Sequence, residues 1–339
     1  MSEEAYVLDD ISGASPLDAL KLLSESLSNS GATKKTEEFW RWKHVSSAFG
    51  PSCGVCAKAA DGRLLGIRPL MRWQLVARGG DHVSAFRPVD TVTAPAARGR
   101  GLFSRMTRVA IDSLADEGEA ILFNTPNASS LPGYVKLGWR RVASLKLKGR
   151  PTSVRGVCRA LWDRLIPKQG VALNPKAVSA RNGNPDDLDE VIRFCVRAEE
   201  ARRRVGLRTV RSEAYIRWRY LQHPNVEYWF LAIRDRRGNV CGVAVIREHF
   251  VLGLRLVFLV DVFSDGGSNP VRSVKRILTE VCVSSRAAFV IAHSAPLSDE
   301  AIGMRRSLFL PLRRIALVSR RVDAGMDGQG LQEWDLSLS

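Results

Sequence analysis

The chain lacks any long apolar run. No window of its 339 residues approaches the roughly eighteen consecutive apolar residues of a membrane-spanning helix. The most apolar segment, residues 250–263, is interrupted by Gly253, Arg255 and Asp261, which predicts two strands. The first residues are acidic and contain no apolar signal core, so we expect a cytoplasmic protein.

Cysteine and histidine are scarce, with six and five residues respectively. Cys53 and Cys56 form a lone C-x-x-C motif, and no second cysteine pair or histidine pair stands nearby to complete a zinc site. The motif falls where a strand is expected to begin. We therefore expect two ordinary thiols in a reducing compartment, and no metal.

Acidic residues are outnumbered, with 35 Asp and Glu against 51 Lys and Arg and a formal charge of +16. Such an excess favours an anionic partner, which includes a nucleotide-bearing cofactor, a nucleic acid or an acidic surface. The basic residues are dispersed, with no long basic run and no recognisable nucleic-acid motif. A nucleic-acid partner therefore stays open but has no motif behind it, and a simply solvated basic surface is an equal alternative.

The chain does contain an internal repeat. Residues 36–44 read TEEFWRWKH and residues 212–220 read SEAYIRWRY, at an offset of 176 residues. The pairs that recur at this offset are Glu37 and Glu213, Arg41 and Arg217, Trp42 and Trp218, Gly62 and Gly238, and Gly66 and Gly242. Asp90 resembles Asp261 at an offset of 171. Self-similarity over this span predicts a duplicated domain, not a short-repeat solenoid.

Both halves predict the same order of elements. An amphipathic helix comes first, followed by a helix that begins at Thr36 or Ser212, then a strand, a glycine turn and a further strand. The apolar positions of the first helices are Leu17, Leu20, Leu23 and Leu27 in one half, and Leu188, Val191, Ile192 and Cys195 in the other. The second half continues with strands over 228–233 and 243–246.

A glycine-rich turn in the first half links a strand to a helix. The strand is expected over 89–93, the turn reads APAARGRGLF over 94–103, and a helix follows. The residues expected on one face of this helix are Leu102, Met106, Val109, Ala110 and Leu114. Glycine lets the backbone approach an anion, and the free N–H groups and dipole of a helix start favour one. The turn therefore predicts a pyrophosphate site.

A second motif follows the helix. A strand over 120–123 leads to Asn127, six further residues, Tyr134, and the ending Val-Lys-Leu-Gly138-Trp139. Together with Arg98-x-x-Gly101, this closely resembles the GNAT superfamily of N-acetyltransferases over residues 89–142. One departure is Phe103, which stands where the family has a small residue and is expected to turn away from the phosphates.

The resemblance implies an α/β fold of two GNAT-like domains, each with a mostly antiparallel twisted sheet flanked by helices. It places a catalytic domain over 1–150, a linker over 151–174 and a degenerate second domain over 175–339. It also implies acetyl-CoA or a longer acyl-CoA as co-substrate. The residues implied to bind CoA are Val92, Thr93, Arg98, Gly99, Arg100, Gly101, Leu102, Phe103 and Asn127.

Two catalytic roles are considered in the first domain. The resemblance implies that Tyr134 protonates the leaving thiolate, because a nearby phenol can donate a proton as charge develops on sulfur. Asp90 is the candidate general base, with the neighbouring pair Asp81-His82 as an alternative. Against Asp90 stands its counterpart Asp261, since an aspartate in both halves suggests a structural role in each.

The second half lacks the phosphate turn. Gly266 and Gly267 precede the aligned position, Asn269 stands within it, and Pro270 removes an N–H donor. We expect this domain to shape the acceptor site or to stabilise the first. The leading reading is an N-acyltransferase whose acceptor is an amine on an amino sugar, amino acid, peptide or small molecule. An aminoacyl-tRNA-dependent peptidyltransferase-like enzyme and a non-catalytic CoA-binding module stay open.

Overall fold

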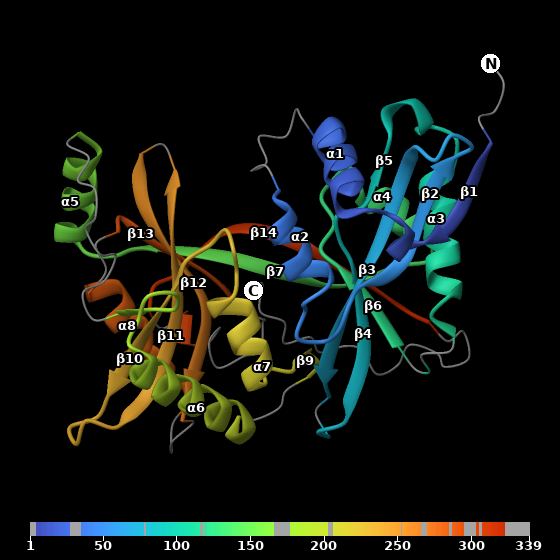
Figure 1. Ribbon diagram of the computed structural model, residues 1–339. Coiled ribbons are helices and arrows are strands. Elements are labelled where there is room, and N and C mark those ends of the chain that lie inside the picture. The colour runs from blue at the N-terminus through green and yellow to red at the C-terminus, as the bar shows by residue number, and fades with distance from the viewer. Residues whose placement is uncertain are drawn as a thin grey trace. The chain divides into compact units, whose positions relative to one another are not determined.

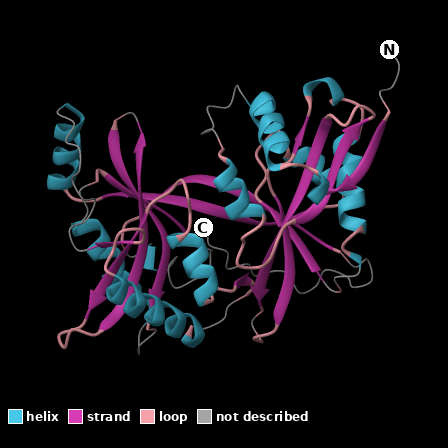
Figure 2. Ribbon diagram, viewed as in Figure 1, coloured by secondary structure: helices cyan, strands magenta, loops and turns pink. Residues whose placement is uncertain are grey.

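The chain folds into two mixed α/β units, shown in the computed structural model of Figure 1. The structure describes residues 5–27, 35–77, 79–115, 118, 120–165, 177–202, 206–251, 253–265, 270–284, 287–294, 303–304 and 307–322. Within these residues, unit 1 comprises the chain up to residue 76 together with 81–143 and 316–322, and unit 2 comprises mainly 144–315. Helices and strands are interleaved in both units (Figure 2). None of the described helices is long and apolar enough to cross a bilayer.

Unit 1 is built on a sheet with the strand order β1-β2-β3-β4-β6-β14. Its elements are β1 (Tyr6–Asp10), α1 (Pro16–Leu27), α2 (Glu37–His44), β2 (Cys53–Ala59), β3 (Leu64–Val76), β4 (His82–Pro88), β5 (Val92–Thr93), α3 (Leu102–Asp112), β6 (Ala120–Asn124) and α4 (Leu131–Lys136). The β4–β6 pair is parallel and the other pairs along this order are antiparallel. This is the mostly antiparallel sheet that the resemblance implies.

Unit 2 has the strand order β7-β13-β12-β11-β10-β8. Its elements are β7 (Arg140–Pro151), α5 (Val154–Leu165), β8 (Ala177–Ser179), α6 (Pro185–Ala201), β9 (Arg208–Thr209), α7 (Glu213–Ile216), a π-helical turn (Arg217–Leu221), β10 (Tyr228–Arg234), β11 (Val240–Val251), β12 (Leu254–Ser264), α8 (Pro270–Ser284), β13 (Phe289–Ser294) and β14 (Leu310–Arg321). Only the β12–β13 pair is parallel. The apolar segment 250–263 forms the end of β11 and most of β12, which confirms the two predicted strands.

The two units exchange chain through strands β7 and β14. Strand β7 crosses from unit 1 into unit 2 at residues 143 and 144, and β14 returns at 315 and 316. The end of β14 pairs with β6 of unit 1, from Val318 opposite Asn124 to Arg321 opposite Ile121. Helix α5 lies inside the segment 151–174 that the sequence suggests as a linker. A division of the chain at 150 and 174 therefore differs from the division into units at both strands.

The internal repeat is visible in local structure. The Thr36 hydroxyl oxygen accepts a hydrogen bond from the Phe39 backbone N–H at 3.2 Å, and Ser212 accepts from Tyr215 at 3.2 Å. Each side chain thereby satisfies an N–H group that a helix start leaves free. Salt bridges one turn apart follow in both helices, between Glu37 and Arg41 and between Glu213 and Arg217. The two predicted helix caps are confirmed.

The repeat extends into the packing of helices on the sheets. Gly66 on β3 faces Met106 of α3, and a Cβ at this glycine would lie 2.8 Å from the Met106 methyl carbon. Gly242 on β11 faces Ile277 of α8 in the same way, at 2.7 Å. Both pairs keep the sequence offsets of 176 and 171. Each glycine lets a helix pack closely on its sheet.

Some predicted core positions are wrong. In α1, Ala19, Leu22 and Leu23 are buried, whereas Leu17 is 66% exposed. In α3, Leu102, Met106 and Ala110 are buried as predicted, but Val109 is exposed and Ile111 takes a core position. The expected strand over 89–93 is also interrupted, because Asp90 has a positive φ of 49° between β4 and β5. Leu188, Val191, Ile192 and Cys195 of α6 are all buried as predicted.

Candidate functional site

The glycine-rich turn leaves the start of helix α3 open. Gly101 is the N-cap residue, with a φ of 74° and no side chain capping the helix, and no acidic residue stands in the first turn. Gly99 has a φ of 77°, and neither glycine has any atom within 4 Å of where a Cβ would lie. Both therefore need a conformation that favours glycine. The free N–H groups at the start of α3 form a suitable place for a pyrophosphate.

Arg98 fastens this turn to its surroundings. Its Nε donates a hydrogen bond to the Thr93 carbonyl at 3.2 Å, and its Nη2 donates to the Ser26 carbonyl at 3.4 Å. The guanidinium is thus engaged with the backbone of β5 and α1, and it holds the turn in place. Arg100, in contrast, is exposed beside the helix start, where its charge favours an anion.

Strand β5 offers backbone groups along one edge. Val92 and Thr93 pair with Ile67 and Gly66 of β3. Strand β4 pairs with β6 as far as Phe86 and Leu122, whereas β5 has β3 as its strand partner within the described residues. The other edge of β5 has no strand partner among them. These strands part in the region where the resemblance places the CoA arm.

Tyr134 lies on α4 and is 4% exposed. Its hydroxyl oxygen accepts hydrogen bonds from Asn124 Nδ2 at 2.6 Å and from Arg68 Nη1 at 3.2 Å. The Tyr134 ring packs edge-on against Trp139 at a centroid distance of 4.9 Å. Because two donors occupy the hydroxyl oxygen, the Tyr134 proton is free to point toward a third group. This arrangement suits a proton donor with a fixed position.

Phe103 is turned inward, as its place in the motif requires. Its ring lies under the Arg68 guanidinium at 4.9 Å and edge-on to the Tyr134 ring at 6.3 Å. Gly133 of α4 faces this ring, since a Cβ there would lie 3.6 Å from it. The large side chain at 103 therefore fills space below the turn and leaves the backbone N–H groups of α3 accessible.

Asn127 organises the start of α4. Its side-chain oxygen accepts hydrogen bonds from the Ser130 N–H at 2.9 Å and from the hydroxyls of Ser130 and Ser129 at 2.9 and 3.1 Å. Its backbone carbonyl accepts from Leu131 N–H at 3.0 Å. The oxygen of this side chain thus has a local structural role, and a contact of Asn127 with CoA stays a prediction.

Asp90 is enclosed by basic side chains. Its carboxylate forms salt bridges with Lys35, with Lys43 at 2.8 Å and with His44 Nε2 at 3.0 Å, and its side chain is 6% exposed. Although burial opposes it, the charges of these three residues hold the pKa of Asp90 well below its usual value. A carboxylate with so low a pKa is a weak base. Asp90 as the general base stays a prediction, and the geometry favours a structural role.

His44 connects Asp90 to Ser52. Burial lowers the pKa of His44 from its usual value, against the opposing attraction of Asp90, so the ring is neutral near pH 7. Its Nδ1 lies 3.0 Å from the Ser52 hydroxyl. The tautomer that satisfies both contacts donates from Nε2 to Asp90 and accepts from Ser52 at Nδ1. Sequence reading missed His44, although its counterpart Tyr220 in the repeat could have marked it.

Arg68 was also missed from the sequence. It is completely buried on β3, with Nη1 donating to Thr91 Oγ1 at 2.9 Å as well as to Tyr134. Its Nε and Nη2 have no hydrogen-bond partner among the described residues. Burial lowers the pKa of the guanidinium, and Tyr134 partly offsets this. A lone arginine in an apolar strand gives no motif that would single it out.

Two further groups of predicted residues have different outcomes. Cys53 and Cys56 are free thiols on β2, and the strand begins at Cys53 as predicted. The described residues contain no cluster of side chains that could hold a metal ion. In unit 2, Gly266, Gly267 and Asn269 lie outside the described residues. Helix α8 begins at Pro270, which is the counterpart of Gly99, so a helix starts where unit 1 has its open turn.

Comparison with known proteins identifies the first part of the chain. Residues 17–142 match the family model of the acetyltransferase (GNAT) domain. No curated protein matches the sequence significantly.

Solved structures share the fold at low sequence identity. N-myristoyltransferase of Saccharomyces cerevisiae with bound myristoyl-CoA superposes with a TM-score of 0.59 and 11% identity, over 94% of this chain and 83% of that one. A protein of unknown function from Enterococcus faecalis, a probable N-acyltransferase, has a TM-score of 0.62 and 13% identity, over 94% and 73%. Residues 17–142 are therefore a GNAT acetyltransferase domain, and the chain as a whole has a tandem GNAT-like fold.

Proposed function

We propose that the chain is an N-acyltransferase that moves an acetyl or longer acyl group from acyl-CoA to a primary amine. The observation that carries this proposal is the open start of α3, where Gly99 and Gly101 have positive φ angles and no neighbour in the Cβ direction. The turn leads directly to an uncapped helix start, which suits the CoA pyrophosphate. The GNAT family match over this segment supports the same ligand.

The chemistry proposed for this site needs no metal. The amine nitrogen attacks the thioester carbonyl, the carbon–sulfur bond breaks, and Tyr134 supplies a proton to the leaving sulfur. The hydrogen bonds from Asn124 and Arg68 fix the direction of the Tyr134 hydroxyl. Because that hydroxyl already accepts two bonds, its proton is directed to a third acceptor.

We leave the length of the acyl chain to experiment. A yeast structural neighbour binds myristoyl-CoA, so donors longer than acetyl-CoA belong in any test. Unit 2 is proposed to bind no CoA, because α8 begins at Pro270 and a proline supplies no backbone N–H. The acceptor is proposed to be an amine on an amino sugar, amino acid, peptide or small molecule.

A thiol-release assay tests the function. The purified chain is incubated with acetyl-CoA or myristoyl-CoA and a panel of amines, and free CoA is measured with a thiol reagent. We expect release that depends on the amine and on the donor. Tight CoA binding without release for any amine would favour a non-catalytic CoA-binding module. Binding of aminoacyl-tRNA in place of CoA would favour a peptidyltransferase-like enzyme.

A further inference from the structure

A buried positive charge beside Tyr134 has no partner of opposite charge. Arg68 is completely buried, and no carboxylate among the described residues forms a salt bridge with it. Two of its three guanidinium nitrogens lack any hydrogen-bond acceptor within this part of the chain. Burying an unpaired charge is costly, and its N–H groups normally find acceptors. An anion supplied from outside the chain would satisfy both requirements.

The fold itself does not require a cation at this position. The counterpart of Arg68 at the offset of 176 residues is Ala244 on β11, which is also completely buried. The alignment is fixed by Gly66 and Gly242, which lie two residues earlier and face equivalent helices. Unit 2 thus builds the same strand with a small apolar side chain. The arginine occurs in the unit that has the open glycine turn.

The surroundings of Arg68 point to one place for the anion. Nη1 donates to the Tyr134 hydroxyl oxygen at 3.2 Å, and the Phe103 ring, from the first turn of α3, lies 4.9 Å from the guanidinium carbon. The guanidinium is therefore held between the helix that begins at the glycine turn and the tyrosine expected to act on sulfur. The remaining N–H groups and the Tyr134 proton are donors on neighbouring side chains.

We propose that Arg68 is a catalytic residue that, together with Tyr134, binds the CoA sulfur as a thiolate. This inference rests on the proposed function and names a residue that the family motif does not contain. When the carbon–sulfur bond breaks, its electron pair stays on sulfur beside the guanidinium. Sulfur then takes the Tyr134 proton, and the phenolate is held by Arg68 and Asn124 until the proton lost by the amine replaces it.

The test compares CoA with desulfo-CoA, which lacks the sulfur atom. Calorimetric titration of both ligands is carried out near neutral and at mildly alkaline pH. If sulfur binds as thiolate, binding releases a proton, so CoA affinity rises with pH below the thiol pKa while desulfo-CoA affinity does not. Because hydrogen bonds to charged groups are strong, we expect CoA to bind at least about tenfold more tightly than desulfo-CoA at alkaline pH.

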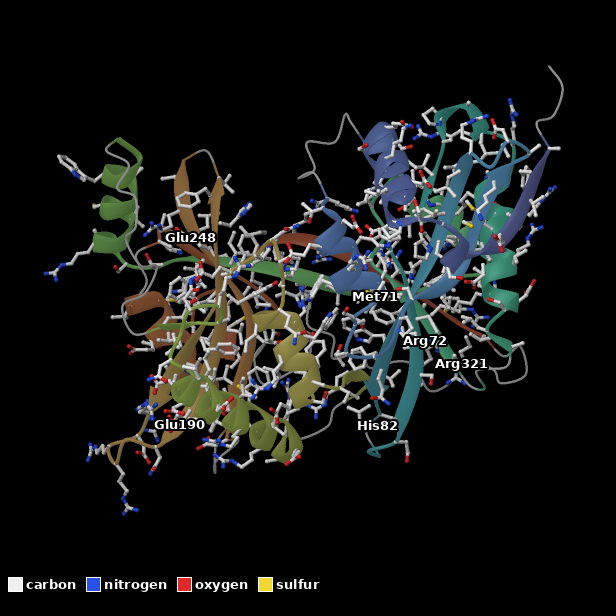
Figure 3. The ribbon with its side chains drawn as sticks, viewed as in Figure 1. Met71, Arg72, His82, Glu190, Glu248 and Arg321 are labelled. Carbon is white, nitrogen blue, oxygen red and sulfur yellow. The ribbon has the colours of Figure 1, made fainter. Side chains whose placement is uncertain are left out.

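Three variants separate charge from packing. Arg68→Met should abolish the preference for CoA while desulfo-CoA still binds, and Arg68→Lys should keep part of it because the charge remains. Arg72→Met, on the same strand β3 and stacked over Phe86, is the matched control and should keep the full preference (Figure 3).

The outcomes distinguish the two proposals. A wild-type chain that binds CoA and desulfo-CoA equally at every pH overturns the role of Arg68, even if Arg68→Met fails to fold. A folded Arg68→Met that keeps the wild-type preference overturns it as well. If the wild-type chain binds neither ligand, the proposed acyl-CoA function fails, and this inference falls with it.

Discussion

His44 Nε2 lies 3.0 Å from Asp90 Oδ2 in unit 1, and the residue that replaces His44 in unit 2 makes the same contact. Tyr220 is the counterpart of His44 at the offset of 176 residues, and its hydroxyl donates to Asp261. Asp261 is in turn the counterpart of Asp90. One hydrogen bond between helix and strand is thus present twice, with a different donor in each unit.

The basic partners of the two aspartates correspond as well. Lys35 forms a salt bridge with Asp90, and its counterpart Arg211 forms one with Asp261 at 2.9 Å. Unit 2 lacks the open glycine turn, yet it keeps this whole arrangement. We therefore infer that Asp90 holds the α2 region to its sheet, as Asp261 does for the π-helical turn after α7.

Asp90→Asn should destabilise the chain without removing its chemistry. The substitution takes the charge from a carboxylate buried among three basic groups, and breaking a buried ion pair from one side typically costs about 3–5 kcal/mol. Urea unfolding measures the loss. Asp261→Asn is the matched control in unit 2 and should cost a similar amount. A stable Asp90→Asn whose turnover collapses and whose alkaline pH profile changes would instead show that Asp90 is the base.

Acid should destabilise the chain in two steps that involve His44 and Asp90. The pKa of His44 is lower in the folded state than its usual value of 6.5, so the unfolded chain binds more protons and stability falls as pH drops through about 6.5. Asp90 has a depressed pKa, so its contribution is present above its usual pKa of 3.8 and is lost below that value.

Melting temperature as a function of pH tests the first step. His44→Gln keeps a side-chain donor for Asp90 but cannot titrate, so its melting temperature should fall less steeply below about pH 6.5. His223 and His293, whose pKa values are both lowered to about 4, should leave a residual slope of the same sign. His82→Gln alters an exposed histidine and should follow the wild-type curve. An unchanged slope in His44→Gln would contradict the account.

Tyr134→Phe should slow turnover and leave CoA binding intact. Loss of a general acid typically reduces the rate about 10²–10⁴-fold. The loss should shrink with a thioester whose leaving thiol is more acidic, because such a thiol needs less help from a proton donor. The hydroxyl also accepts buried bonds from Asn124 and Arg68, so the variant should lose about 1–3 kcal/mol of stability.

Steady-state kinetics and calorimetry together decide the role of Tyr134. Full activity in Tyr134→Phe would mean that the proton comes from another group or from solvent. Loss of CoA affinity would assign Tyr134 to the cofactor pocket.

Local signals in the sequence account for much of the fold. The capping residues Thr36 and Ser212 predicted helix starts because a hydroxyl there satisfies a free N–H group. The glycine spacing at Gly99 and Gly101 predicted an open turn because both need positive φ angles. These features depend on a few neighbouring residues, so the sequence alone reveals them.

Features that depend on distant residues were not predictable in this way. The position of Arg68 beside Tyr134 brings together residues 66 positions apart, and β3 is buried on both faces, so alternation gives no sign of which side chain is special. The pairing of β14 with β6 joins the two ends of the chain. The helix-to-strand contact between His44 and Asp90 was hidden for the same reason, although the repeat held the signal.

Calorimetric titration with CoA, of the wild-type chain and of Gly101→Val, tests the central claim most directly. We predict one CoA site per chain in the wild type and no measurable site in Gly101→Val, since a β-branched residue disfavours a φ of 74° and blocks the approach of the pyrophosphate to α3. Gly62→Val is the control, because Gly62 also has a positive φ and open surroundings but lies in the turn between β2 and β3. Its CoA affinity should be unchanged. Unchanged affinity in Gly101→Val, or two CoA sites per chain, would contradict the account.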